Sequence, residues 1–175
     1  MPPATLRRTA AVLALALGLA ACSDAAGPSA PQATFTGRWA GRPWAANAHA
    51  TLVLGGTASD TLHLGGAWPA GAPYPAQSLH IRLAPFRGPG TYVLGGDAVE
   101  MMDLVGGDAV SSTYVGARPL AGVVEIVRFA PGGLVEGTVS FRAVPGYGLG
   151  QYGTSPEFED GRFQADVRVF QWPPR

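Results

Sequence analysis

The segment Phe163-Gln164-Ala165-Asp166-Val167-Arg168-Val169 alternates apolar and polar residues without a break. In an extended strand, successive side chains point to opposite faces, so Phe163, Ala165 and Val167 share one face. A helix would scatter these residues around its axis. The segment is therefore predicted to be a strand with one buried face and one solvated face, as in an antiparallel sheet.

The same period of two recurs throughout the chain on the N-terminal side of this segment. Leu79, Ile81 and Leu83 share one face, and Leu62 and Leu64 share another. Further strands are predicted at residues 48–54, 61–64, 79–84, 91–94, 99–105, 123–129 and 135–143, with an edge piece at 113–115. No segment has a convincing helical period. The chain is predicted to be all-β.

Five Gly-Gly pairs punctuate these segments, at 55–56, 65–66, 95–96, 106–107 and 132–133. Glycine adopts the positive φ that tight hairpins need, so the pairs are predicted to be turns. A phosphate cradle is the alternative, but no helix follows any pair. The pattern predicts a single antiparallel β-sandwich or flattened barrel of about 8–10 short strands.

The N-terminus has the features of an export signal. Arg7 and Arg8 precede an uncharged apolar run that is shorter than the about 20 residues of a membrane-spanning helix. The run ends in Leu19-Ala20-Ala21-Cys22, which matches the bacterial lipoprotein box. In such proteins the signal is cut before the cysteine, whose thiol receives diacylglycerol and whose new amine is acylated, commonly with palmitate. The alternative is an ordinary signal peptide with a chance cysteine.

We therefore expect residues 1–21 to be a lipoprotein signal peptide and Cys22 to be the lipidated first residue of the mature chain. Residues 22–33 are rich in Ala, Ser, Pro and Gly and are predicted to be a flexible tether, followed by one β-domain at residues 34–175. Ser23, rather than an aspartate, follows the cysteine, which favours anchoring in the outer membrane of the cell envelope.

Composition excludes several classes of function. Cys22 is the only cysteine, so lipidation leaves no thiol for a disulfide, a nucleophile or a zinc-thiolate site. The chain has no lysine, which excludes a P-loop and a pyridoxal Schiff base. The formal net charge is zero, so no basic surface for nucleic acid is indicated. No serine-hydrolase elbow or zinc-protease motif occurs. We expect neither an enzyme nor a cofactor.

Seven short motifs occur in a fixed order over nearly all of the mature chain. They are residues 35–39 (FTGRW), 41–46 (GRPWAA), 90–94 (GTYVL), 112–114 (STY), 122–126 (GVVEI), 135–141 (VEGTVSF) and 160–163 (DGRF). In this order the chain resembles a family of uncharacterised bacterial lipoproteins, each a small secreted β-domain of unknown function. Val139 departs from the aromatic residue usual in that family. The resemblance implies a β-sandwich-like fold and brings no catalytic residues.

His49, His63 and His80 are the only histidines, and the strand pattern places all three on the outward face. If their strands are neighbours, the imidazoles could converge on a metal ion, because three histidines and a water form a known zinc geometry. The alternative is three histidines on a solvated sheet face.

Trp68, Tyr74, Tyr147 and Tyr152 lie in Pro- and Gly-rich stretches. Aromatic side chains on loops can stack on sugars or partner surfaces, and the alternative is that they fold back over the core. Gly37-Arg38-Trp39 also matches the short Gly-x-Trp motif at the start of lipocalins, which leaves a carrier of a small apolar ligand as an alternative function.

The sequence thus predicts a membrane-anchored envelope lipoprotein whose β-domain is a non-enzymatic binding or structural module. Its expected partners are the membrane, through Cys22, and a glycan, a small apolar ligand or another envelope protein.

Overall fold

The computed structural model describes residues 33–55, 59–118, 121–148 and 151–171. The chain divides into two units, Met1–Pro31 and Gln32–Arg175, and the first lies wholly outside the described residues. The predicted signal peptide, Cys22 and the tether as far as residue 32 therefore also lie outside them. In the part of the chain that is described, no helix has the length and apolar character needed to cross a membrane.

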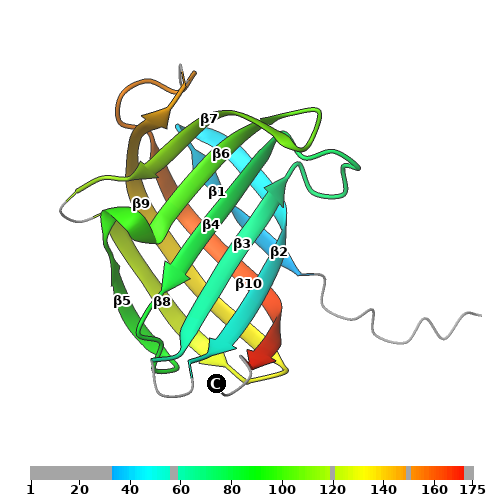
Figure 1. The fold of residues 1–175 in the computed structure, drawn as a ribbon, viewed down its shortest axis with the longest axis vertical. Coiled ribbons are helices and arrows are strands. Elements are labelled where there is room, and N and C mark those ends of the chain that lie inside the picture. The colour runs from blue at the N-terminus through cyan, green and yellow to red at the C-terminus, as the bar shows by residue number, and fades with distance from the viewer. Residues whose placement is uncertain (1–32, 56–58, 119–120, 149–150, 172–175) are drawn as a thin grey trace, which may run out of the picture. The chain divides into compact units, whose positions relative to one another are not determined.

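The second unit is built almost entirely of strands, which confirms the predicted all-β class (Figure 1). In chain order the elements are β1 (Thr34–Trp39), β2 (Arg42–Leu54), β3 (Thr61–Trp68), β4 (Gln77–Leu83), β5 (Gly90–Leu94), the 3₁₀ turn η1 (Gly96–Ala98), β6 (Val99–Val105), β7 (Ala109–Gly116), β8 (Gly122–Phe129), β9 (Leu134–Tyr147) and β10 (Glu157–Gln171). The predicted inward faces of β2, β3, β4, β8 and β9 are the buried ones.

All ten strands belong to one sheet that curls into a ring-like wall (Figure 1). Pairing runs from β2 through β3, β4, β6, β7 and β9 to β10, which returns to β2. The sheet is mostly antiparallel, as predicted, and β10–β2 is the one parallel pair among the described strands. The reason is that β1 is short: it lies between β10 and β2 along part of their length, and beyond it residues 167–171 pair directly with 50–54.

The wall forks at β9. The first part of β9 pairs with β8, its last residues pair with β7, and β8 carries β5 at the end of the sheet order. Strand β7 pairs with both β6 and β9, so the prediction of a short edge piece at residues 113–115 is wrong. β7 also contributes to the inner face of the ring, because Ser112 and Tyr114 are buried.

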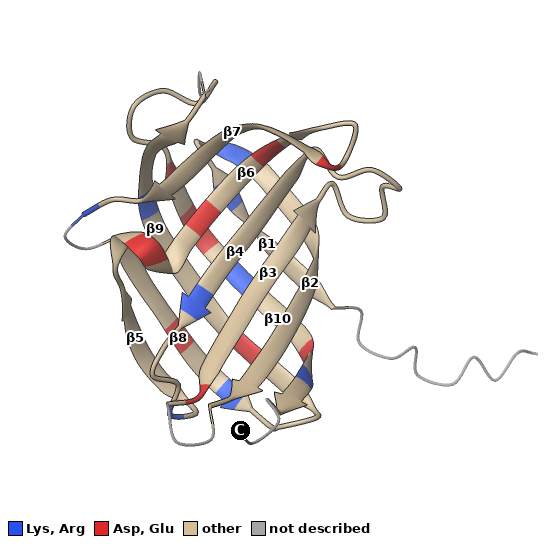
Figure 2. Cartoon of the chain, in the orientation of Figure 1, with Lys and Arg blue, Asp and Glu red and all other residues tan. Residues whose placement is uncertain are grey.

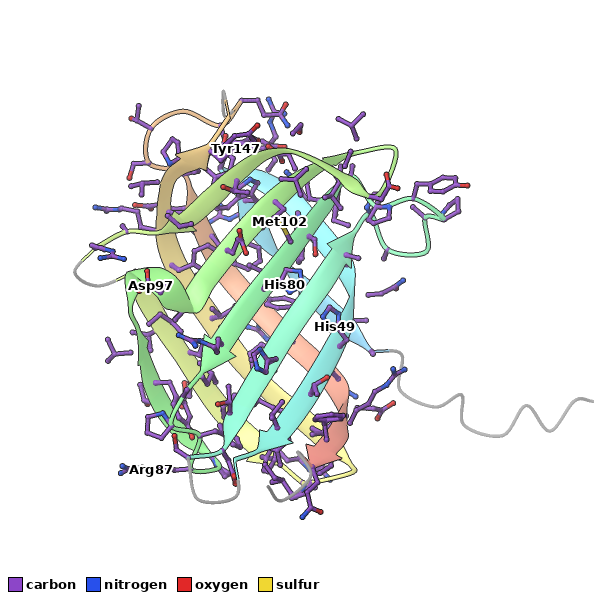
Figure 3. The ribbon with its side chains drawn as sticks, in the orientation of Figure 1. His49, His80, Arg87, Asp97, Met102 and Tyr147 are labelled. Atoms are coloured by element: carbon purple, nitrogen blue, oxygen red, sulfur yellow. The ribbon has the colours of Figure 1, made fainter. Side chains whose placement is uncertain are left out.

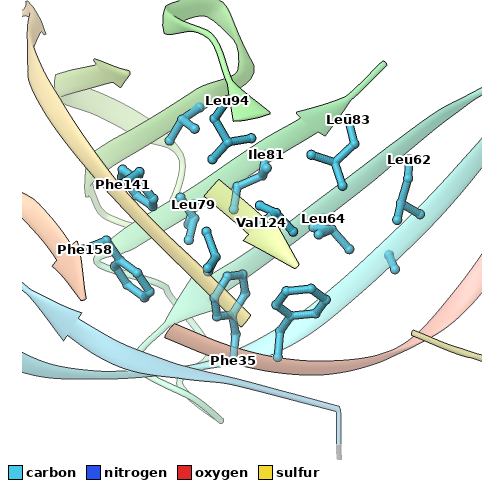
Figure 4. Close-up of a cluster of buried hydrophobic side chains, with 14 of the residues drawn as sticks. Phe35, Leu62, Leu64, Leu79, Ile81, Leu83, Leu94, Val124, Phe141 and Phe158 are labelled. Carbon is cyan, nitrogen blue, oxygen red and sulfur yellow. The ribbon is translucent and has the colours of Figure 1, made fainter. Parts of the chain in front are cut away.

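Apolar side chains from all sides of the ring meet inside it and form one buried cluster (Figure 4). Phe35, Phe141, Phe158 and Phe163 form its aromatic centre; Phe141 stacks on Phe158 with ring centroids 5.3 Å apart, and Phe35 meets Phe158 edge-on at 5.8 Å. Such geometries add about 0.5–1.5 kcal/mol per pair to area burial. The buried side chains of the ring thus form a single core.

Two of the five glycine pairs behave as predicted turns. Gly106 and Gly107 both have positive φ between β6 and β7, and Gly132 has positive φ between β8 and β9. The prediction is wrong for Gly65 and Gly66, which lie inside β3, and for Gly95 and Gly96, which lead into η1 without positive φ. The pair at 55–56 lies partly outside the described residues. A glycine pair can make space as well as a turn.

Candidate functional site

The three histidines lie on the outward face of neighbouring strands, as the sequence predicted. His49 is on β2, His63 on β3 and His80 on β4. The register aligns His49 with Gly65 and Gly65 with His80, so the two imidazoles flank a glycine in one row across three strands. Figure 3 shows both side chains on the same face of the wall.

Gly65 is what allows His49 to reach across β3. A Cβ atom added at Gly65 would lie 2.2 Å from His49 Nε2 and 2.4 Å from His49 Cε1, so the imidazole occupies the space that any other residue would fill. The ring thereby comes to 6.1 Å from that of His80, centroid to centroid, at an interplanar angle of 64°. Nε2 of His80 is in turn hydrogen-bonded to Oγ of Ser78 at 2.8 Å.

The histidines line a surface pocket of about 170 Å³, which we call the histidine pocket. Its other polar walls are Arg82 on β4, Glu100 on β6 and Asp97 in η1. A second pocket of about 280 Å³ adjoins it, sharing Arg82 and Asp97, and lies between the end of β4 and β5, where the sheet order ends. Few charged residues occur elsewhere on the wall of β2, β3, β4 and β6 (Figure 2).

Electrostatics keeps two of the imidazoles neutral. The pKa of His49 is lowered below its ordinary 6.5 by burial of its ring, and further by the nearby His80 and Arg168. The pKa of His63 is lowered by burial first, then by Arg82 and His80. At neutral pH both rings therefore offer one N–H donor and one acceptor nitrogen.

No group of three or more His, Cys, Asp or Glu side chains in the described residues is placed to hold a metal ion. The predicted convergence of His49, His63 and His80 on a metal therefore gains no support from the geometry, and we propose no metal centre. The three residues share a pocket instead of a coordination sphere. A pocket with donors, acceptors and both signs of charge suits a small polar ligand.

Of the four aromatics expected on loops, Trp68 is the last residue of β3 and Tyr147 the last of β9, whereas Tyr74 and Tyr152 lie outside the strands. Tyr152 folds back over the core: its ring lies 5.8 Å from that of Trp39, and its backbone N–H donates to Tyr114 Oη at 2.9 Å. Trp68 is also packed against the core. Tyr74 and Tyr147 stand 72% and 67% exposed, so ligand binding stays a prediction for these two.

A buried polar network, which the sequence reasoning missed, lies inside the ring beneath Tyr152. Gln77 Nε2 donates to Asp103 Oδ1 and to Tyr152 Oη, both at 2.8 Å, and Trp44 Nε1 donates to Gln77 Oε1 at 3.1 Å. The Ser112 hydroxyl donates to Asp103 Oδ2 at 2.5 Å, and Asp103 is only 5% exposed. These hydrogen bonds satisfy the buried groups and fix one arrangement of the strands.

Two tyrosines next to this network are desolvated. Burial, the largest cause, raises the pKa of Tyr114 and of Tyr152 above the ordinary 10.0, and Asp103 raises both further. Trp39 Nε1 is the one buried side-chain donor in the described residues that lacks a hydrogen-bond partner. Trp44 is thus hydrogen-bonded to this network, whereas Trp39 forms no hydrogen bond to it.

A signal for the network was present in the sequence. On β6, Asp103 lies two residues after Met101 and therefore points inward like it. On β4, Gln77 lies two residues before Leu79 and points inward for the same reason. A polar residue at an inward position indicates a buried partner, because an unpaired buried polar group is costly. The partner itself could not be named, because Gln77 and Asp103 meet only through strand pairing.

Comparison with known proteins gives no relative. No protein-family model, no curated protein and no solved structure matches the chain.

Proposed function

We propose that this chain is an envelope lipoprotein, anchored in the outer membrane through lipid on Cys22, and that its β-domain is a non-enzymatic module that binds a small polar ligand in the histidine pocket. The proposed binding function rests on the position of His49, whose imidazole fills the space above Gly65 and reaches towards His80.

The anchor rests on the lipobox at residues 19–22. Two or more acyl chains hold a protein stably at a membrane, whereas a single chain gives marginal binding. Mass spectrometry of membrane fractions is expected to find a mature chain that begins at a diacylglyceryl, N-acylated Cys22. A Cys22→Ser chain should lose the modification. An unmodified, soluble mature protein would refute the anchor.

The pocket is a better ligand site than the ring interior. Phe35, Phe141, Phe158 and the other inward side chains contact one another across the interior. A lipocalin-like carrier, the alternative function, would need that space for an apolar ligand. The outer pocket instead presents imidazole, guanidinium and carboxylate groups that hydrogen-bond a polar ligand from the surface.

Nuclear magnetic resonance can test the pocket directly, because the chain has only three histidines and all three line it. The full-length chain in a non-ionic detergent would be screened against envelope-derived small molecules while the imidazole Hε1 signals are followed. A ligand of the pocket should shift these signals in a saturable way. A Gly65→Ala variant, in which His49 must move, should bind that ligand with lower affinity.

The matched control is Gly66→Ala, whose added Cβ would meet the inward Trp44 at 2.9 Å instead of a histidine. A screen that leaves all three signals unchanged would refute ligand binding at this pocket.

A further inference from the structure

The chemistry of the histidine pocket also identifies a class of ligand. Resting on the binding function proposed above, we propose that the pocket takes a small zwitterion, with its anionic group at Arg82 and its ammonium group at Glu100.

The cationic side of the pocket is Arg82. It lies on the outward face of β4, aligned with His63 on β3, and its side chain is exposed. Among the described residues it takes part in none of the ion pairs. Its planar guanidinium is suited to a carboxylate or phosphate, and the imidazoles of His63 and His80 add donors next to it.

The anionic side is Glu100. It lies on β6, aligned with His80 across the β4–β6 pair, and it is half-buried. Within the described part of the chain Glu100 also forms no ion pair. Asp97, the other acid of the pocket, is already held by Arg118 at 2.6 Å. Among the described residues, Arg82 and Glu100 are thus the cation and the anion of the pocket that no ion pair compensates.

Arg82 and Glu100 line the same pocket from two neighbouring strands and are offset along them. The β4–β6 pairing ends at Ile81 and Val99, so Arg82 lies one residue beyond it, whereas Glu100 lies inside it. Both residues line the pocket, whose 170 Å³ corresponds to about six waters at ~30 Å³ each. A simple anion or cation would compensate one side only, whereas a zwitterion compensates both.

Two sources supply this chemistry: a free amino acid, and the ethanolamine phosphate headgroup of a lipid. Both present an ammonium group a few bonds from an anionic group. Glycine, O-phosphoethanolamine and a short-chain phosphatidylethanolamine are therefore the probes, and their relative affinities distinguish the sources. Three half-ligands serve as comparisons: ethanolamine supplies only the positive charge, and acetate and inorganic phosphate supply only the negative charge.

The experiment titrates the full-length chain, in a non-ionic detergent, with each probe and follows the three imidazole signals. At least one zwitterion should bind at least tenfold more tightly than its half-ligands. Arg82→Gln and Glu100→Gln should each lower the affinity for that zwitterion at least tenfold. The matched controls Arg87→Gln and Glu125→Gln, which replace exposed residues outside the pocket, should leave its affinity unchanged. Circular dichroism confirms that each variant is folded.

Acetate or phosphate binding as tightly as the zwitterions would overturn the zwitterion inference and leave the proposed binding function standing. An equal loss of affinity in Arg82→Gln and Arg87→Gln would overturn it as well, because the effect would then come from the net charge of the protein and not from the pocket. Zwitterions that leave the imidazole signals unchanged also overturn it, while the wider ligand screen decides the proposed function separately.

Discussion

At position 65 the absence of a side chain gives His49 its place on the wall. We expect Gly65→Ala to destabilise the protein by about 1–3 kcal/mol, because the new methyl group must displace the imidazole and also comes within 3.0 Å of the Leu79 carbonyl oxygen. Urea unfolding measures this loss. Adding His49→Ala to Gly65→Ala should recover part of it, and a strictly additive double variant would show that the two residues do not compete for space.

Two buried tryptophans differ in one hydrogen bond. Trp44 donates to Gln77, whereas the Trp39 indole N–H has no hydrogen-bond partner among the described residues, and both side chains are almost fully buried. Trp44→Phe should therefore cost about 1–3 kcal/mol more than Trp39→Phe, since only the former leaves a buried acceptor unpaired. Chemical denaturation of the two variants checks the difference. An equal or larger loss in Trp39→Phe would contradict it.

The lowered pKa values of His49 and His63 predict how stability varies with pH. An unfolded histidine titrates near 6.5 and these folded ones titrate lower, so the unfolded chain binds more protons just below pH 6.5. The contribution of these two histidines to the free energy of unfolding should therefore be fully present well above pH 6.5. It should fall as the pH drops through that value, and level off once the folded histidines are also protonated. Urea midpoints measured over this range test the slope.

The His49→Gln, His63→Gln double variant should lose most of this pH dependence. An unchanged slope in that variant would assign the dependence to other groups.

At the scale of elements, β10 is the strand on which the sheet depends. It pairs with β1, β2 and β9, and it contributes Phe158, Phe163, Ala165 and Val167 to the core. A chain that ends at residue 148 should therefore have no cooperative unfolding transition, because the ring is left open and β1 loses one of its two neighbours. Circular dichroism in a temperature scan measures this.

Strand β5 is the comparison, since it pairs only with β8. Val93→Lys, at an exposed position of β5, should keep the cooperative transition and change the free energy of unfolding by no more than about 0.5 kcal/mol. A cooperative transition in the truncated chain would show that β10 is dispensable.

At the scale of the whole molecule, one buried cluster connects all sides of the ring. Unfolding of this unit should therefore be two-state, with the same midpoint by far-ultraviolet circular dichroism and by tryptophan fluorescence, because Trp39 and Trp44 lie within that cluster. Separate midpoints would show that part of the wall, such as β5 with β8, unfolds independently.

Much of the fold could be predicted from the sequence because burial on one face imposes a period of two. Leu79, Ile81 and Leu83 on β4 and Leu62 and Leu64 on β3 are buried as their alternation indicates. The outward placement of the three histidines followed from the same parity. The parallel β10–β2 pair could not be predicted, because it depends on how far the short β1 extends between its neighbours.

The sequence by itself determined the all-β class and the faces of the strands, because each of these depends on residues that are close together in the chain; the proposal of a lipid anchor at Cys22 rests on the sequence of residues 19–22 in the same way. The tertiary structure alone decided that Gly65 makes space for His49, that Gln77 and Asp103 share a hydrogen bond, and that Arg82 and Glu100 line the same pocket. The physical reason is strand pairing: it brings together residues far apart in the chain, and the alternation within one strand does not say which other strand lies beside it.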